Sequence, residues 1–168
     1  SRRYVREKIA MMQIIIDSLR PDYLTMETEP ATMVANTGGR VDFSVDSVLS
    51  YVRQYCAALR RGGTKLCSGS GSWDDPAYIR RLAAETAIDA IDCHVYPINN
   101  NLLLPRLFDA REEAEKNGKE FIIGEAWLYK ASDAEMSAPR DPVAASVEIF
   151  ARDGLDYLVP VDTLFIRS

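Results

Sequence analysis

A repeating strand-then-helix pattern constrains the fold of this chain more than any other feature. Short strand-like runs begin at "DYLTM", "TKLCS", "AIDCH" and "EFIIG", at positions 22, 64, 90 and 120. They recur roughly every 30 residues, which is the size of one βα unit. Strands that are joined through helices run parallel with right-handed crossovers, so the pattern predicts an α/β fold with a parallel sheet.

The segments between these runs carry helix signals. Apolar side chains repeat at helical spacing over residues 45–59, before Gly62 and Gly63. Asp75 and Pro76 form a cap and a first helical position. Five helices are predicted: 1–20, 45–59, one that begins at 76, one from near Pro105 to Gly118, and 143–158 after Asp141 and Pro142. In the first helix the apolar residues Val5, Ile9, Met12, Ile16 and Leu19 lie on one face. Residues 22–30 are predicted as a strand stopped by Pro30, and 31–40 as a loop.

Composition indicates one globular domain without a nucleic-acid or membrane partner. The 168 residues are 47% hydrophobic and 27% charged, with a net charge of −5, whereas a nucleic-acid-binding face would be basic. No run of eighteen apolar residues exists, and the basic start lacks the cleavage site of a signal peptide. Cys56, Cys67 and Cys93 form no CxxC pair, so we expect buried small residues and no disulfide framework.

Two architectures fit the repeat: an open doubly wound sheet and a (β/α)₈ barrel. A nucleotide-binding open sheet would carry a glycine-rich turn after an early strand. The one candidate, "SGSGSW" at 68–73, lacks GxGxxG spacing and the lysine of a P-loop. We therefore interpret it as a βα loop.

Polar residues gather at the carboxyl ends of the predicted strands. They are Glu27 and Glu29 on the first, Ser68 and Ser70 after the second, His94 and Tyr96 on the third, and Glu125 and Trp127 on the fourth. In parallel α/β folds the active site lies at that end, where the βα loops converge. The sequence therefore predicts one shared site.

Each of these residues has a structural alternative. Glu29 could be only a cap for the following loop, and His94, the single histidine, could be a satisfied core residue. Glu27 alternates with Glu29 and is predicted to share its face, either as a second functional carboxylate or as a buried, satisfied acid. Trp127 and, more weakly, Trp73 could stack on a sugar ring or pack in the core.

Three of these motifs together resemble clan A of the glycoside hydrolases. "METEP" is similar to the end of the fourth barrel strand, "IDCHVYPIN" to the sixth and "FIIGEAW" to the seventh. The resemblance implies that Glu29 is the acid/base and Glu125 the nucleophile of a retaining glycosidase acting on a β-linked saccharide. Glu125 follows Glu29 by 96 positions, three units of 32, as strands four and seven require.

The resemblance also implies a substrate site and a position within the barrel. His94 and Tyr96 would line the sugar site, and Trp73 and Trp127 would offer stacking faces. Thr28 stands where the clan has an asparagine that contacts the sugar 2-hydroxyl. A full barrel needs about 250 residues, so the chain is expected to correspond to strands four to seven, with little activity of its own.

A retaining mechanism needs two carboxyl groups about 5–5.5 Å apart, one ionised and one protonated. We expect Glu125 to be ionised beside donors such as Tyr96, and Glu29 to be protonated. This chemistry needs no cofactor and takes a carbohydrate as partner, while open sheet edges could promote self-association. One alternative is a metal-dependent sugar isomerase or epimerase that uses Glu29, Asp92, His94 and Glu125. Another is a carbohydrate-binding barrel without catalysis. The localisation stays open, and secretion is compatible with the resemblance.

Overall fold

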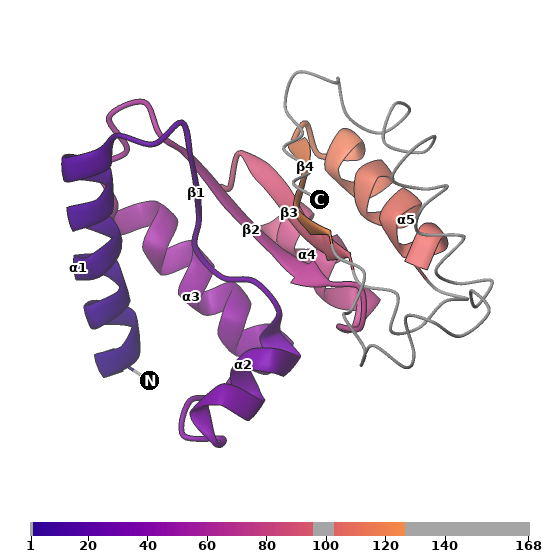
Figure 1. Cartoon of the computed structure of the whole chain (residues 1–168), viewed down its shortest axis with the longest axis horizontal. Helices are drawn as coiled ribbons and strands as arrows, with labels where there is room; N and C mark the ends of the chain where they lie inside the picture. The colour runs from indigo at the N-terminus through magenta and orange to yellow at the C-terminus, as the bar shows by residue number, and fades with distance from the viewer. Residues whose placement is uncertain (1, 96–102, 127–168) are drawn as a thin grey trace, which may run out of the picture.

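The structure is a computed structural model that describes residues 2–95 and 103–126 (Figure 1). Strands and helices follow one another along these residues as the sequence predicts. The elements are α1 (Arg2–Leu19), β1 (Tyr23–Thr25), α2 (Pro30–Thr37), α3 (Val45–Ala58), β2 (Lys65–Gly71), α4 (Pro76–Glu85), β3 (Ala90–Val95), α5 (Leu103–Lys116) and β4 (Glu120–Ala126).

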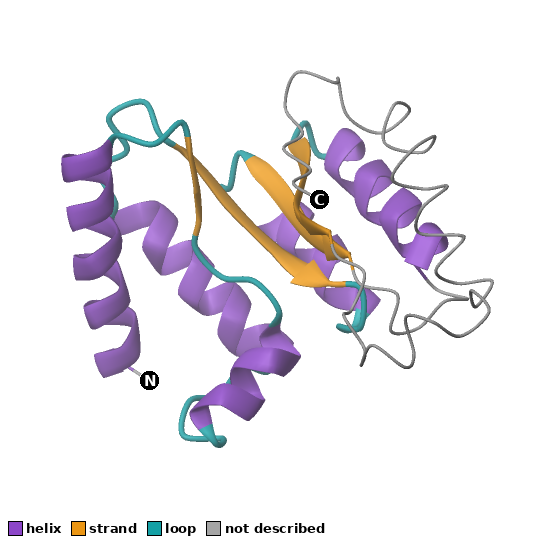
Figure 2. Cartoon of the chain, in the orientation of Figure 1, coloured by secondary structure: helices purple, strands orange, loops and turns teal. Residues whose placement is uncertain are grey.

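The four strands form one parallel sheet in the order β1-β2-β3-β4. The sheet curls into a half-barrel (Figure 2). Helices α1, α3, α4 and α5 contact one another in that order, and α4 packs on β2 while α5 packs on β3 and β4. The helices therefore line one side of the sheet. The predicted parallel α/β class is confirmed.

The hydrophobic core lies between this row of helices and the sheet. Val48, Leu49 and Val52 of α3 are fully buried, as are Leu66 of β2 and Ile91 of β3. These residues are buried because amphipathic helices pack their apolar faces against the parallel sheet.

Helix α1 buries most of the face that its periodicity predicts. Val5, Met12 and Ile16 are buried, and Ile9 packs against the core at partial exposure. Leu19 does not follow the prediction, because it is 74% exposed at the last turn of the helix.

The prediction of a loop over residues 31–40 is wrong for the first part of this segment, because Pro30–Thr37 forms α2. Proline at the first helical position suits a helix start, and Gly38 ends the helix in the left-handed conformation with its N–H bonded to the Ala35 carbonyl. The preceding strand is correspondingly shorter than predicted and ends at Thr25.

Ser68 and Ser70 lie within β2, although they are predicted to follow it. They pair with Ile91 and Cys93, and paired residues of parallel strands point to the same side. The Ser68 hydroxyl lies 3.3 Å from the Tyr78 hydroxyl of α4, so this side faces the helices. Gly69 and Gly71 face the opposite side of β2, so this side carries no side chains near the carboxyl end of the strand, whereas Lys65 and Cys67 lie on it nearer the start.

Four other predictions concern the bounds of α5, the cysteines, membrane-spanning segments and the last predicted helix. Helix α5 begins two residues before Pro105 and ends before Gly118, close to its prediction. Cys67 and Cys93 are buried as expected, and Cys56 is half-buried. Among the helices that the structure describes, none has the length and hydropathy of a bilayer-spanning segment. The helix predicted over 143–158 lies outside the described residues.

Candidate active site

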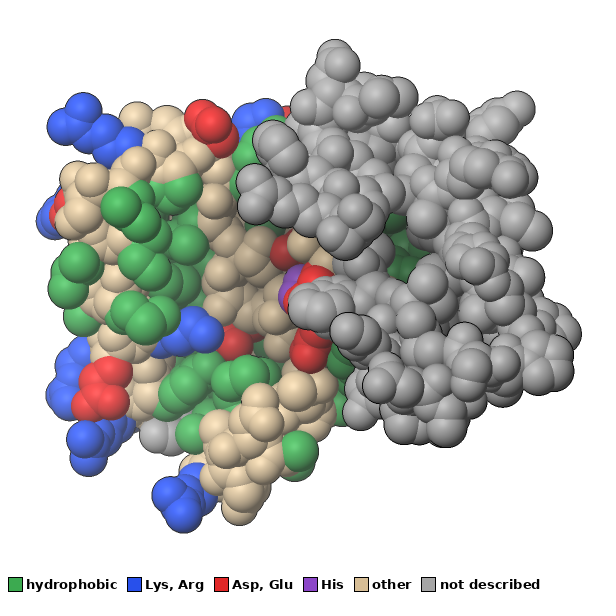
Figure 3. All heavy atoms as spheres, viewed as in Figure 1, with side chains coloured by type: hydrophobic (Ala, Val, Ile, Leu, Met, Phe, Trp, Pro, Cys, Tyr) green, Lys and Arg blue, Asp and Glu red, His purple; other side chains and the backbone are tan. Residues whose placement is uncertain are grey.

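Three of the predicted residues meet at the carboxyl ends of the strands. His94 Nδ1 lies 2.7 Å from Glu29 Oε1 and 3.1 Å from Glu125 Oε2. One oxygen of each carboxylate and the imidazole nitrogen all lie within 4.8 Å of one another. The space-filling view shows the histidine beside acidic side chains near the middle of the face turned to the viewer (Figure 3). The predicted convergence of Glu29, His94 and Glu125 therefore occurs.

Glu29 reaches this position through an unusual backbone conformation. Its φ of 49° and ψ of 62° are left-handed, a region that residues with a Cβ adopt rarely and at a cost of about 1–3 kcal/mol. Glu29 is the N-cap residue of α2, yet its side chain makes no capping hydrogen bond. The carboxylate instead contacts His94. The alternative that Glu29 only caps the following loop is therefore wrong, because this segment is a helix and the Glu29 side chain does not cap it.

The side chains of His94, Glu29 and Glu125 are all partly buried, and burial and nearby charges act together on the pKa of His94. The side chain of His94 is 13% exposed, against 17% for Glu29 and 35% for Glu125. Burial lowers the pKa of His94, but the nearby Asp92 carboxylate, the hydrogen bond with Glu29 and the charge of Glu125 raise it to about 9. At neutral pH the imidazole is therefore a cation between carboxylates.

We expect the single imidazole to titrate near pH 9 in an NMR experiment on its ring carbon. Because this pKa lies above the unfolded value of about 6.5, the stability from protonated His94 is complete below pH 6.5 and is lost as pH rises toward 9. Chemical denaturation between pH 6 and pH 10 should show this loss in the wild type and not in His94→Gln. A midpoint near 6.5 would mean that the carboxylates do not surround the ring in solution.

Asp92 supports the site from the same strand as His94. Its side chain is buried and accepts the Thr25 hydroxyl at 2.7 Å and the Gly124 N–H at 2.9 Å. Its Oδ2 lies 3.8 Å from His94 Nε2. Asp92 entered the sequence analysis only as a metal ligand. Its position two residues before His94 was the signal that both share a face.

Glu27 does not share the face of Glu29, contrary to the prediction. Its Oε1 accepts the hydroxyls of Tyr4 and Tyr55 at 2.8 Å each, and Lys8 Nζ lies 3.5 Å from Oε2. Burial, followed by the charge of Glu27, raises the pKa of both tyrosines well above the ordinary value. Because the chain leaves the strand after Thr25, simple alternation fails here. Glu27 is a buried acid satisfied by α1 and α3.

Asp74, which the sequence analysis missed, ties the Glu29 segment to the end of β2. Its buried carboxylate accepts the Ala31 N–H at 2.9 Å and the Gly71 N–H at 2.7 Å. Burial raises the pKa of this carboxyl, and the nearby Glu29 charge adds to the increase. Arg106 of α5 donates to the carbonyls of Ser72 and Asp74. These bonds fix the start of α2 beside His94.

Of the remaining predicted site residues, the structure describes Trp73 and Thr28. Trp73 is half-buried, and a Cβ on Gly71 would come within 2.5 Å of its ring. Gly71 pairs with His94, so the indole lies on the His94 side of the sheet. Thr28 is half-buried directly before Glu29. Tyr96 and Trp127 lie outside the described residues.

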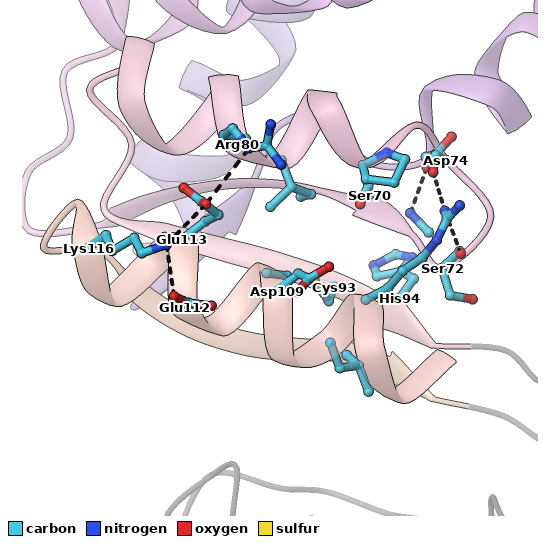
Figure 4. Close-up of a pocket in the computed structure, with 16 residues that line it drawn as sticks. Ser70, Ser72, Asp74, Arg80, Cys93, His94, Asp109, Glu112, Glu113 and Lys116 are labelled. Carbon is cyan, nitrogen blue, oxygen red and sulfur yellow. Dashed lines mark hydrogen bonds and ion pairs between the residues drawn. The ribbon is translucent and has the colours of Figure 1, made fainter. Parts of the chain in front are cut away.

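A cavity of about 260 Å³ lies between α4 and α5. Figure 4 shows Arg80 on one side of it and Glu113 and Lys116 on the other. Its sheet wall includes Ser70 and Cys93, which point to the helical side. His94, Asp74 and Arg106 also line the cavity, whereas Glu29 and Glu125 do not, so the cavity adjoins the candidate active site.

Comparisons with protein-family models, curated proteins and solved structures returned no match to this chain. The functional argument therefore depends on the residues and their geometry.

Proposed function

We propose that this chain carries the catalytic carboxylates of a retaining glycoside hydrolase that cleaves β-linked oligo- or polysaccharides. One observation supports this most: oxygens of Glu29 and Glu125 lie within 4.8 Å of one another at the carboxyl end of a parallel sheet. Retaining enzymes hold their carboxyl groups about 5–5.5 Å apart, whereas inverting enzymes need about 6.5–9.5 Å. The geometry therefore favours double displacement.

In this mechanism the two acids have different roles. The Glu125 carboxylate attacks the anomeric carbon and forms a glycosyl ester, while Glu29 gives its proton to the departing oxygen. Glu29 then removes a proton from water, which attacks the same carbon and releases Glu125. The two roles require different surroundings, and Glu29 is the less exposed of the pair. The His94 cation lies 3.1 Å from Glu125 and offsets the charge of this carboxylate before substrate binds.

The proposed substrate site is the side of the sheet that faces away from the helices. Trp73 lies on the same side of the sheet as His94 and would give a sugar ring a stacking surface. Within the described residues β1 and β4 each have one neighbouring strand. We propose that further strands complete a (β/α)₈ barrel at these edges, or that a second copy pairs there.

The test is covalent trapping in the protein at its full native length. A panel of 2-deoxy-2-fluoro-β-glycosides with activated leaving groups should label the wild type, and peptide mass spectrometry should locate the sugar on Glu125. Proton NMR of the first product should show retained β configuration. Inverted product, or a label on another residue, contradicts the proposal. Binding of saccharides without turnover would support a carbohydrate-binding barrel.

A second candidate is a metal-dependent sugar isomerase or epimerase. It is favoured by one carboxylate oxygen from each of Glu29 and Glu125 and the Nδ1 of His94, which could together hold a divalent cation. Asp92 suits a ligand less well, because Thr25 and Gly124 already occupy its two oxygens. Dialysis against EDTA separates the candidates, since the retaining mechanism survives it. Loss of activity that Mn²⁺ or Zn²⁺ restores would favour the isomerase.

A further inference from the structure

The pairing of β3 with β4 is irregular beside the proposed nucleophile. Cys93 pairs with Ile123, but the next residue, His94, pairs with Glu125. Gly124 is therefore an extra residue in β4, which is a β-bulge. Since paired residues of parallel strands point to the same side, Glu125 shares the side of His94, and Ile123 shares the side of Cys93.

This bulge decides on which side of the sheet Glu125 lies. In a regular strand, residues two apart point to the same side, so Glu125 would follow Ile123. Ile123 and Cys93 are buried in the core between the sheet and the helices. Without the bulge, the Glu125 carboxylate would thus be directed into the apolar layer and away from Glu29.

One buried carboxylate contacts the bulge directly. Asp92 Oδ1 accepts the Gly124 N–H at 2.9 Å, which gives the bulged residue a side-chain acceptor. Asp92 Oδ2 accepts the Thr25 hydroxyl at 2.7 Å, so the same side chain joins β1, β3 and β4. Asp92 is only 4% exposed, and a buried carboxylate is retained only where such partners satisfy it.

Glycine at position 124 makes this contact possible. A Cβ added to Gly124 would lie 2.2 Å from Asp92 Oδ1 and 2.8 Å from its Cγ. Any larger residue would push the carboxylate off the bulge. Asp92 and Gly124 therefore form a matched pair, one supplying the acceptor and the other the room for it.

We propose that Asp92 is a positioning residue that holds the β-bulge at Gly124 and so keeps Glu125 on the same side of the sheet as Glu29 and His94. This inference rests on the proposed function for its catalytic consequence. Its structural content, the Asp92 to Gly124 hydrogen bond, can be measured without any substrate.

The test compares Asp92→Ala, Asp92→Asn and the control Asp89→Ala in the protein at its full native length. Asp89 is a suitable control because it directly precedes β3 and also accepts a backbone N–H, that of Leu66 at 2.8 Å, away from the site. Asp92→Ala should lower kcat by about 10²-fold through misplacement of Glu125, with KM little changed. Asn keeps an acceptor oxygen for Gly124 and should restore most of kcat. Asp89→Ala should leave kcat unchanged.

Hydrogen exchange at the Gly124 amide provides the readout that is independent of activity. Exchange should accelerate in Asp92→Ala and stay slow in Asp92→Asn and Asp89→Ala. If Asp92→Ala does not fold, Gly124→Ala replaces it in the test, and it should lower kcat by a similar factor because its Cβ displaces the Asp92 carboxylate.

An unchanged Gly124 exchange rate in Asp92→Ala overturns the inference, as does a kcat equal to that of Asp89→Ala. A wild type that hydrolyses no glycoside but shows the expected exchange pattern contradicts the proposed function alone.

Discussion

Replacing Glu125 with glutamine is expected to abolish covalent labelling by a 2-deoxy-2-fluoro-β-glycoside and to lower kcat by on the order of 10⁴-fold. The amide that replaces the carboxylate has nearly the same shape. The fold and the contact with His94, which lies 3.1 Å from the Glu125 carboxylate, should therefore be retained. The loss would then be chemical. The measurement is the rate of labelling, followed by intact mass, together with kcat on an aryl glycoside.

Glu29→Gln is the matched comparison, because the two acids have separable roles. It should lower kcat on substrates with poor leaving groups by about 10²–10⁴-fold, since the general acid is lost. Labelling by a fluoride leaving group needs no proton donor and should persist. If Glu125→Gln labels as fast as the wild type, the assignment of the nucleophile is wrong. If the two variants behave alike on every leaving group, the division of roles is wrong.

Replacing Glu27 with alanine is expected to lower the free energy of unfolding by about 3–5 kcal/mol, the usual cost of removing one partner from a buried ion pair. The variant would leave the hydroxyls of Tyr4 and Tyr55 and the ammonium of Lys8 without their shared acceptor. Glu27→Gln, which keeps an oxygen for the tyrosines, should be less damaging. Urea denaturation monitored by tryptophan fluorescence measures both.

Glu120 offers a control, because it also contacts a tyrosine and a lysine but lies at the solvent-exposed surface. Its carboxylate accepts the Tyr23 hydroxyl at 2.8 Å and contacts Lys65, but this cluster is largely exposed. Glu120→Ala should therefore cost only about 0–1 kcal/mol. Equal losses for Glu27→Ala and Glu120→Ala would show that burial does not set the contribution of Glu27.

The sequence was sufficient to predict the parallel α/β class and the convergence of Glu29, His94 and Glu125. Both follow from regular rules: the period of the βα units and the tendency of parallel strands to end at one edge. The errors lie where the backbone departs from regularity. Alternation predicts that Glu27 and Glu29 share a face, and it fails because β1 ends at Thr25 and Glu29 adopts a left-handed conformation.

The bulge at Gly124 could not be predicted for a related reason. Its cause is a tertiary contact with Asp92, 32 residues earlier, and no local pattern reports such a contact. Helix α2 was missed because its first turn depends partly on the Asp74 carboxylate, which is distant in sequence. Trp73 was assigned to the site from its residue type, and the structure adds that Gly71 leaves room for its ring.

The strand order β1-β2-β3-β4 also has a consequence for biosynthesis. Each new strand pairs with the one made just before it, so the sheet can grow in the direction of translation, one βα unit at a time. Glu29 and His94 can meet once β3 has docked, but Glu125 arrives only with β4. A nascent chain would therefore bring Glu29, the proposed acid/base, and His94 together before it contains Glu125, the proposed nucleophile, so the proposed reaction could not begin until β4 is added.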